Sequence, residues 1–155
     1  MNLYIDGDAL PNALKQILIR AIERLSIPTV VVSNKYVNLG KSRHVTYIVV
    51  DAGPDEADNR IVELVQPGEL VITANIPLAD RVITKKAHAI DHRGKLFTED
   101  NIKQLLAVRN LMQEIRDSGE ITKGPAPFGP KDTHEFANQL NKFLTQNRFG
   151  KPLNR

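Results

Sequence analysis

Four aspartate residues stand where a predicted strand ends or a predicted helix begins. Asp6 and Asp8 close the short apolar run that starts the chain, and Asp55 and Asp58 belong to the sequence Asp-Glu-Ala-Asp. Asp55 and Asp58 lie three residues apart, so they share one face of the helix predicted there. Crowded carboxylates repel one another unless a cation neutralises them, and hard oxygen ligands suit Mg²⁺ or Mn²⁺. We therefore expect these four side chains to bind a divalent metal ion.

Strand and helix patterns alternate along the chain and would bring these groups together. Nearly continuous apolar strands separated by amphipathic helices are typical of a parallel sheet covered on both faces. We expect an α/β fold of three layers, α/β/α, with a mainly parallel central sheet. In such sheets, sites form at the carboxyl ends of the strands. The strands are predicted at 1–6, 29–33, 45–50, 70–73 and 87–91. The helices are predicted over 13–25 with Pro11 in the first turn, from an opening at 51–58, after Pro77, at 98–116 and near 132–144.

The fourth predicted strand ends in Thr-Ala-Asn, which adds polar groups to the same edge. Thr73 and Asn75 are expected there, with Asp80 a little further on as a supporting acid. Structural interpretations stay open for several of these residues. Asp8 and Asp55 also suit a helix start or a turn, and the Thr-Ala-Asn run also suits a helix N-cap before Pro77.

Basic and amide side chains of the loop after the second strand are candidates for phosphate contacts. Asn34, Lys35 and Arg43 are expected at the same sheet edge as the acids, and Arg60 lies on the helix that carries Asp55 and Asp58. Phosphates are commonly bound by such groups. A solvated loop, and a pairing of Arg60 with the neighbouring acids, are the structural alternatives.

Composition and length set the remaining expectations. The chain has 155 residues, no cysteine and a net charge of +3, which is too small to argue for nucleic-acid binding by itself. We expect one domain over residues 1–147, including the C-terminal helices, and a tail at 148–155. The long helix at 98–116 is expected to bury Ile102, Leu105, Leu106, Leu111, Met112 and Ile115, and residues 119–130 form a predicted loop. No apolar run reaches the ~20 residues of a membrane span, so we predict a cytoplasmic protein without membrane contact.

Four segments resemble the successive motifs of the bacterial YaiI/YqxD family. They are Tyr-Ile-Asp-Gly-Asp-Ala from Tyr4, Asp-Glu-Ala-Asp-Asn-Arg-Ile from Asp55, Val-Ile-Thr-Ala-Asn-Ile-Pro-Leu-Ala from Val71 and Lys-Gly-Pro-Ala-Pro-Phe from Lys123. The resemblance covers nearly the whole chain. It implies a PIN-like fold, whose active members are magnesium- or manganese-dependent nucleases.

The resemblance also implies roles for single residues. Asp6 resembles the first acid of a PIN-like site, Asp55 or Asp58 the second, and Thr73 the hydroxyl residue that ends the fourth strand. Asn75 stands where that pattern usually has an aspartate, and Pro77 stands where many such nucleases have another. Asn75 can still ligate a metal through its carbonyl oxygen, but it cannot act as a base.

Two functions follow as expectations. The first is a metal-dependent nuclease with Asp6, Asp55 and Asp58 as catalytic residues, acting on phosphodiester bonds of RNA. The second, favoured by Asn75 and Pro77, is a catalytically weak or inactive module that binds RNA or a protein partner. The sequence predicts no oligomeric state.

Overall fold

The computed structural model describes residues 1–120, 127–147 and 149, and these residues form one six-stranded sheet. The strand order is β3-β2-β1-β4-β5-β6, and every neighbouring pair is parallel except β5 and β6. The mainly parallel sheet predicted from the sequence is therefore confirmed. The strands are β1 (Leu3–Asp6), β2 (Thr29–Ser33), β3 (Val45–Val49), β4 (Leu70–Ile72), β5 (His88–Ile90) and β6 (Leu96–Phe97).

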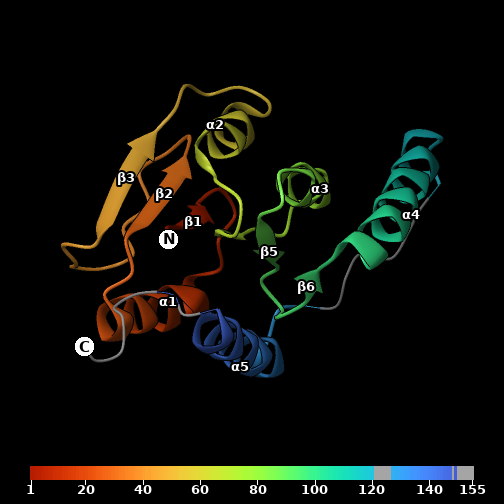
Figure 1. The fold of residues 1–155 in the computed structure, drawn as a ribbon. Coiled ribbons are helices and arrows are strands. Elements are labelled where there is room, and N and C mark those ends of the chain that lie inside the picture. The colour runs from red at the N-terminus through yellow and green to blue at the C-terminus, as the bar shows by residue number, and fades with distance from the viewer. Residues whose placement is uncertain (121–126, 148, 150–155) are drawn as a thin grey trace.

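Helices cover both faces of the sheet, as predicted for a three-layer α/β/α fold (Figure 1). Two helices pack on one face, two pack on the other, and the fifth stands at the β6 side of the molecule. On the first face lie α1 (Asn12–Leu25) and α5 (Pro130–Gln146), on the second α2 (Glu56–Leu64) and α3 (Ile76–Thr84), and beside them α4 (Glu99–Asp117).

The alternation of side chains along the central strand β1 divides the core in two. Leu3 and Ile5 pack with α1 and α5, whereas Tyr4 packs with α2 and α3. Side chains of a strand alternate between its faces, so Asp6 is on the side of α2 and α3. All four side chains of β1 are buried, and the strand therefore holds its terminal carboxyl group rigidly between two packed layers.

The turn between β5 and β6 attaches the sheet to the start of α5. Arg93 forms an ion pair with Asp132 at 2.9 Å and lies 5.6 Å from the ring centroid of Phe128. Asp132 also accepts a hydrogen bond from the Gly129 N–H, which caps α5. The sequence did not predict the strand β6, because two residues are too short for a periodic signal.

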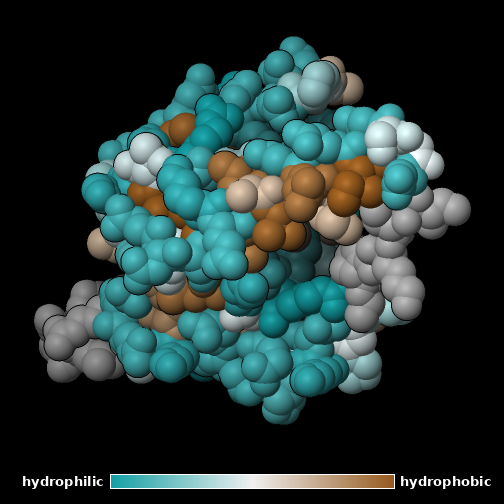
Figure 2. All heavy atoms as spheres, turned by 90° about the vertical axis from the view of Figure 1, so that its right-hand side faces the viewer, coloured by the Kyte–Doolittle hydropathy of each residue, from teal (hydrophilic) through white to brown (hydrophobic). Residues whose placement is uncertain are grey.

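Helix α4 departs from the prediction that its apolar residues face the core. Of the predicted inward residues, Ile102 is buried, Leu111 is 55% exposed and the others are half-buried, and Val108 on the same helix is 52% exposed. The helix contacts the body through its first turns, beside α3, and then leaves it (Figure 1). Figure 2 shows the resulting band of apolar surface on this side of the molecule. Amphipathic spacing identified the helix correctly but not what its apolar side packs against.

The packed part of the chain extends beyond the predicted domain end at residue 147. Phe149 is 3% exposed, and its ring centroid lies 5.8 Å from that of Phe143 on α5. The prediction of a tail beginning at residue 148 is therefore wrong for Phe149. The rest of that tail, residues 148 and 150–155, and residues 121–126 of the predicted loop lie outside the described residues.

We expect Gly94→Ala to destabilise the fold through the contact between the β5–β6 turn and α5. Gly94 has a φ of +90°, and an added Cβ would lie 2.7 Å from the carbonyl oxygen of Glu135. The left-handed backbone costs an L-residue ~1 kcal/mol, and forced overpacking adds about 1–3 kcal/mol.

Gly119→Ala is the matched control, because Gly119 has a φ of +88° and no atom of the described residues lies within 4 Å of the added Cβ. Urea unfolding of both variants separates the clash from the backbone strain. Equal losses of unfolding free energy would show that the turn does not press on α5.

Candidate functional site

The carboxyl group of Asp6 lies at the end of β1 and is nearly enclosed by protein. Asp6 is 7% exposed. Its Oδ2 accepts a hydrogen bond from the Thr73 hydroxyl at 2.8 Å, and its Oδ1 accepts one from the Asp8 N–H at 3.3 Å. Thr73 follows β4, which is the parallel neighbour of β1. The sequence prediction that these two strand ends meet is therefore confirmed.

Burial raises the pKa of Asp6 to about 6. The Thr73 hydroxyl opposes this rise, because it stabilises the charged form, whereas the charges of Asp58 and Asp8 add to it. Close to neutral pH, this carboxyl group therefore exchanges its proton more readily than an ordinary aspartate does. A titratable group perturbed by burial and by like charges is typical of functional sites.

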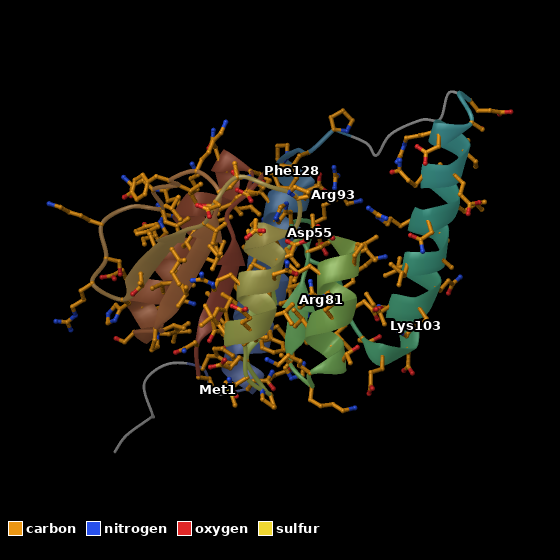
Figure 3. All side chains as sticks on the ribbon, turned by 90° about the horizontal axis from the view of Figure 1, so that it is seen from above. Met1, Asp55, Arg81, Arg93, Lys103 and Phe128 are labelled. Carbon is orange, nitrogen blue, oxygen red and sulfur yellow. The ribbon has the colours of Figure 1, made fainter. Side chains whose placement is uncertain are left out.

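Asp58 reaches the same place from the first turn of α2. It is half-buried, and its Oδ2 accepts a hydrogen bond from the Asn75 side-chain nitrogen at 2.9 Å. Burial raises the pKa of Asp58, and so do the negative charges of Asp55 and Asp8. Arg81 and the Asn75 hydrogen bond act in the opposite direction. The sheet edge thus gathers Asp6, Asp8 and Asp58, and Asp55 stands next to them at the start of α2 (Figure 3).

Asp8 does not cap α1, which was one structural interpretation of its position. Its Oδ1 accepts a hydrogen bond from the Asn34 N–H at 3.0 Å, and the N-cap residue of α1 is Pro11. Asp8 therefore joins the end of β1 to the loop after β2. Gly7 allows this approach, because a Cβ there would lie 2.9 Å from the Cβ of Ser33.

Asp55 occupies the N-cap position of α2 with a φ of +65°, and its side chain makes no capping hydrogen bond. A left-handed backbone is uncommon for a residue other than glycine, although aspartate tolerates it better than most. The side chain is exposed. The carboxylate therefore stays free for a contact outside the helix, rather than satisfying the helix end.

Asn75 presents a donor to the acidic cluster, and this corrects its predicted role as an oxygen ligand. Its Oδ1 accepts a hydrogen bond from the Leu78 N–H at 3.2 Å and caps α3. That bond directs the amide nitrogen toward Asp58. The alternative prediction, an N-cap before Pro77, is confirmed.

Asp80 lies outside the acidic cluster, so its predicted supporting role is wrong. Its Oδ1 forms an ion pair with Lys103 of α4 at 2.9 Å. Figure 3 shows Lys103 beyond α3 from Asp55. Asp80 is four residues past the helix start and turns toward α4, a rotation that sequence distance from Asn75 does not reveal.

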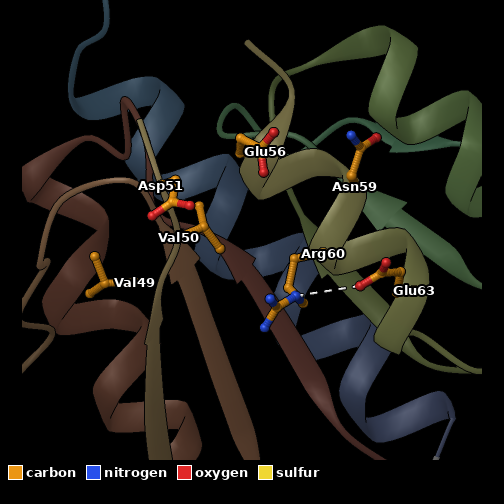
Figure 4. Close-up of a pocket in the computed structure, with 7 residues that line it drawn as sticks. All are labelled: Val49, Val50, Asp51, Glu56, Asn59, Arg60 and Glu63. Carbon is orange, nitrogen blue, oxygen red and sulfur yellow. Dashed lines mark ion pairs between the residues drawn. The ribbon is translucent and has the colours of Figure 1, made fainter. Parts of the chain in front are cut away.

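The four predicted phosphate-contact residues do not gather at one place. Asn34 and Lys35 follow the carboxyl end of β2 and lie at the acidic edge. Arg43 lies at the amino ends of the strands, away from the acids. The reason is that β3 is parallel to β2, so the loop must return along the sheet before β3 begins. Arg60 pairs with Glu63 at 3.4 Å, so its predicted pairing with Asp55 or Asp58 is wrong. It faces a polar pocket between β3 and α2 (Figure 4).

Three residues of this edge were missed by the sequence reasoning. Arg81 of α3 acts on Asp58 electrostatically and donates a hydrogen bond to the side chain of Asn59 at 2.8 Å. Ser33 ends β2 with a buried hydroxyl that donates to the Lys35 carbonyl. His92 follows β5, and its buried Nε2 has no hydrogen-bond partner among the described residues. The rule that strand ends meet at one edge identifies Ser33 and His92, whereas nothing in the sequence identifies Arg81.

The donor chemistry of this edge fits a hard divalent cation, but the side chains are not arranged as an assembled metal site. Within the described residues, no group of three or more His, Cys, Asp and Glu side chains is placed to hold a metal ion. Asp6, Asp8 and Asp58 nevertheless influence one another electrostatically. Small movements of Asp8, Asp55 and Asp58, which are less enclosed than Asp6, would be needed to bring their oxygens onto one ion.

Comparison with known proteins gives consistent matches along the chain. Residues 4–146 match the family described as "Uncharacterized BCR, YaiI/YqxD family". A UPF0178 protein of Sulfurimonas denitrificans is 66% identical over 95% of this chain and 97% of its own length. One from Sulfurovum sp. (strain NBC37-1) is 63% identical over 95% and 99%, and one from Maridesulfovibrio salexigens is 49% identical over 94% and 97%. No solved structure matches the chain. In the part that the structure describes, no helix is both long and apolar enough to cross a membrane.

We expect the buried carboxyl group of Asp6 to make the fold less stable as the pH rises from about 4 to about 6. Its pKa is about 6 in the folded protein, against an ordinary value of 3.8. Between these two pKa values the folded state binds more protons than the unfolded state. The stability that protonated Asp6 contributes is therefore fully present below pH 3.8 and is lost as the pH rises through about 6. The expected loss is on the order of 3 kcal/mol.

Urea unfolding across this pH range measures the slope. Asp6→Asn should flatten it and should be more stable than the wild type at neutral pH, because the neutral amide is not penalised by burial. Asp80→Asn is the control and should keep the slope, since Asp80 faces α4. A slope that survives Asp6→Asn unchanged would assign it to another group.

Proposed function

The chain belongs to the YaiI/YqxD family, and on that premise we propose that its acidic edge binds Mg²⁺ or Mn²⁺ and hydrolyses phosphodiester bonds in RNA. The observation that carries the proposal is the crowding of carboxyl groups around the buried Asp6. Burial and the neighbouring acids raise the pKa values of both Asp6 and Asp58. Among the described residues, no lysine or arginine forms an ion pair with Asp6, Asp8, Asp55 or Asp58. A cation from solution would relieve this repulsion.

The residues that would hold the ion are Asp6, Asp8, Asp55 and Asp58. When bound, a divalent ion supplies Lewis-acid stabilisation of a phosphoryl oxygen and lowers the pKa of a water. Thr73 fixes the orientation of the Asp6 carboxyl group by donating to its Oδ2. Without the ion, Asp6 has a pKa of about 6, so it can release its proton near neutral pH and offer a charged carboxylate to the ion. Lys35, exposed at the same edge, is placed to approach a phosphate of the substrate.

The choice of RNA as substrate rests on the resemblance to PIN-like nucleases and on the site's own donors. Asn34 and Lys35 lie next to the acids, so phosphate-binding and cation-binding groups meet at one edge. Such an edge, outside the carboxyl ends of parallel strands, is where ligands bind in α/β proteins.

A second function, a non-catalytic module that binds RNA or a protein partner, is favoured by the orientation of Asn75. Its amide nitrogen satisfies Asp58 without a cation. Its carbonyl oxygen is already used in capping α3. In this alternative, the neutral donor stabilises the acidic edge as an apo structure, and catalysis is weak or absent.

We expect calorimetric titration with Mn²⁺ at neutral pH to show binding to the wild type and a loss of at least tenfold in affinity in Asp6→Asn. Removing one of the ligating charges weakens a hard-cation site, while the substituted amide keeps an oxygen that can accept a hydrogen bond at the strand end. Asp80→Asn should bind as the wild type does. Equal binding by all three proteins would move the ion away from β1, and no binding would favour the non-catalytic module.

We expect Asn75→Asp to destabilise the protein without a cation and to strengthen its response to one. Aspartate caps a helix as well as asparagine does, so α3 keeps its N-cap. The donor to Asp58 is replaced by another carboxylate, which should lower the unfolding free energy by about 1–3 kcal/mol at neutral pH.

Thermal unfolding with and without Mn²⁺ tests this substitution, and hydrolysis of a labelled single-stranded RNA gives a second readout. The ion should restore the stability of Asn75→Asp, and the RNA should be cleaved faster than by the wild type. A loss of stability that Mn²⁺ does not reverse would place residue 75 outside the cation site.

A further inference from the structure

The strand β3 is the outermost strand on one side of the sheet, and no helix or strand of the described residues covers its outer side. In the strand order it pairs with β2 alone, and Figure 1 shows no helix or strand of the described chain beyond it. The outermost strand on the other side, β6, is less suited to pairing, because it has only two residues and leads directly into α4. An open edge presents unpaired backbone N–H and C=O groups to solvent and can pair with another strand.

Two hydrogen bonds establish which residues of β3 face outward. The Thr29 N–H donates to the His44 carbonyl at 2.9 Å, and the Val50 N–H donates to the Ser33 carbonyl at 2.9 Å. The backbone N–H and C=O groups of the even-numbered residues therefore point toward β2. Backbone groups alternate along a strand, so the N–H and C=O groups of Val45, Tyr47 and Val49 point to the open side.

The edge lacks the features that usually prevent strands from pairing. Its sequence is Val-Thr-Tyr-Ile-Val, without a charge, a proline or a glycine. Proteins commonly protect an edge with lysine, proline, bulges or a covering element. Val49 is instead 55% exposed, and Tyr36, whose ring centroid lies 5.2 Å from that of Tyr47, is 63% exposed. Val49 is also one of the residues that line the pocket between β3 and α2 (Figure 4).

We propose that β3 pairs antiparallel with β3 of a second copy of this chain, so that two sheets join into one across a two-fold axis at Tyr47. Centring the pair on Tyr47 places Val45 opposite the partner's Val49. The backbone N–H and C=O groups of all three residues point outward, so each opposed pair can exchange two backbone hydrogen bonds. The alignment therefore gives about six inter-strand hydrogen bonds. The two-fold axis closes the assembly, because each copy uses the same open edge.

The charges at the two ends of β3 favour this occupant over an unrelated peptide. Arg43 is four residues before Tyr47 and Asp51 is four residues after it. The antiparallel alignment therefore brings Arg43 opposite the partner's Asp51, and the same pair recurs at the other end. Neither residue forms an ion pair within the described part of its own chain. Opposite charges facing each other across strands add to pairing, whereas like charges oppose it.

Tyr47 and Val49 also place apolar surface at the centre of the contact. Side chains on directly opposed residues lie on one face of the joined sheet. Tyr36 and Tyr47 of each copy would form a group of four rings across the axis. The contact is small by the standard of stable dimers, so we expect a reversible association in the micromolar range, about 10 to 100 μM.

Sedimentation velocity over a series of protein concentrations tests the proposal. The wild type should change from monomer to dimer. Arg43→Glu and Asp51→Arg should each raise the dissociation constant at least tenfold, because each change opposes like charges twice in the dimer. The double variant Arg43→Glu/Asp51→Arg should return to within about threefold of the wild type, because the charges are exchanged but remain opposite.

Two further variants separate this edge from other surfaces. Val49→Pro removes an outward N–H without touching the hydrogen bonds to β2, so it should abolish the dimer while the circular dichroism spectrum stays that of the folded protein. Leu111→Lys, on the exposed side of α4, should leave the dissociation constant unchanged. A protein that stays monomeric up to about 1 mM, or a dimer lost in Leu111→Lys but kept in Val49→Pro, would overturn the proposal.

Discussion

The candidate site depends on the burial of one carboxyl group at the end of the central strand. Asp6 is 7% exposed, and the packing of β1 between two layers leaves it no freedom to move toward solvent. The protein supplies a hydroxyl donor from Thr73 and a backbone donor from Asp8, but no ion pair with a basic side chain of the described chain. The rise of its pKa to about 6 is the direct consequence. Neighbouring elements contribute further acids. The neutral side-chain amide of Asn75 donates a hydrogen bond to Asp58 and stabilises the negative charge of that carboxylate alone.

Topology explains why most of the acidic edge could be predicted from the sequence. Once strands are parallel, residues that follow them must meet at one edge, whatever the details of packing. Two contacts follow this rule. Thr73 donates a hydrogen bond to Asp6, and the loop at Asn34 is joined to the end of β1 through Asp8. Asp58 was also located correctly, because α2 begins at the same edge as β3 ends. For these residues, position along the chain is sufficient information.

The predictions that were wrong depend on rotation and on the return path of the chain. Asp80 lies on α3, as expected, but the helix turns it to Lys103 of α4. Asn75 was located correctly, yet the Leu78 N–H determines which of its two polar atoms meets Asp58. Arg43 belongs to the loop after β2, but a parallel crossover carries it to the far edge of the sheet. Leu111 is amphipathically placed on α4, although the helix has already left the body at that point. In each case the deciding contact comes from an element whose orientation the sequence does not specify.

In the proposed site, protons and cations would compete for the same carboxyl groups, and this competition would limit the pH range in which the site binds an ion. A proton on Asp6 removes the charge that would attract a cation, and a bound cation lowers the pKa of Asp6 by favouring its charged form. Because that pKa is about 6 without an ion, the cost of ionising Asp6 for a cation is small at neutral pH and grows in acid. The hydrogen bond from Asn75 also affects cation binding in the proposed site. It stabilises the charged Asp58 without a cation, and so lowers the binding free energy that an ion would obtain from this carboxylate. In the proposed site, cation affinity would therefore depend on two carboxyl groups: Asp6, whose ionisation becomes costly only below neutral pH, and Asp58, whose charge the Asn75 amide already stabilises in part.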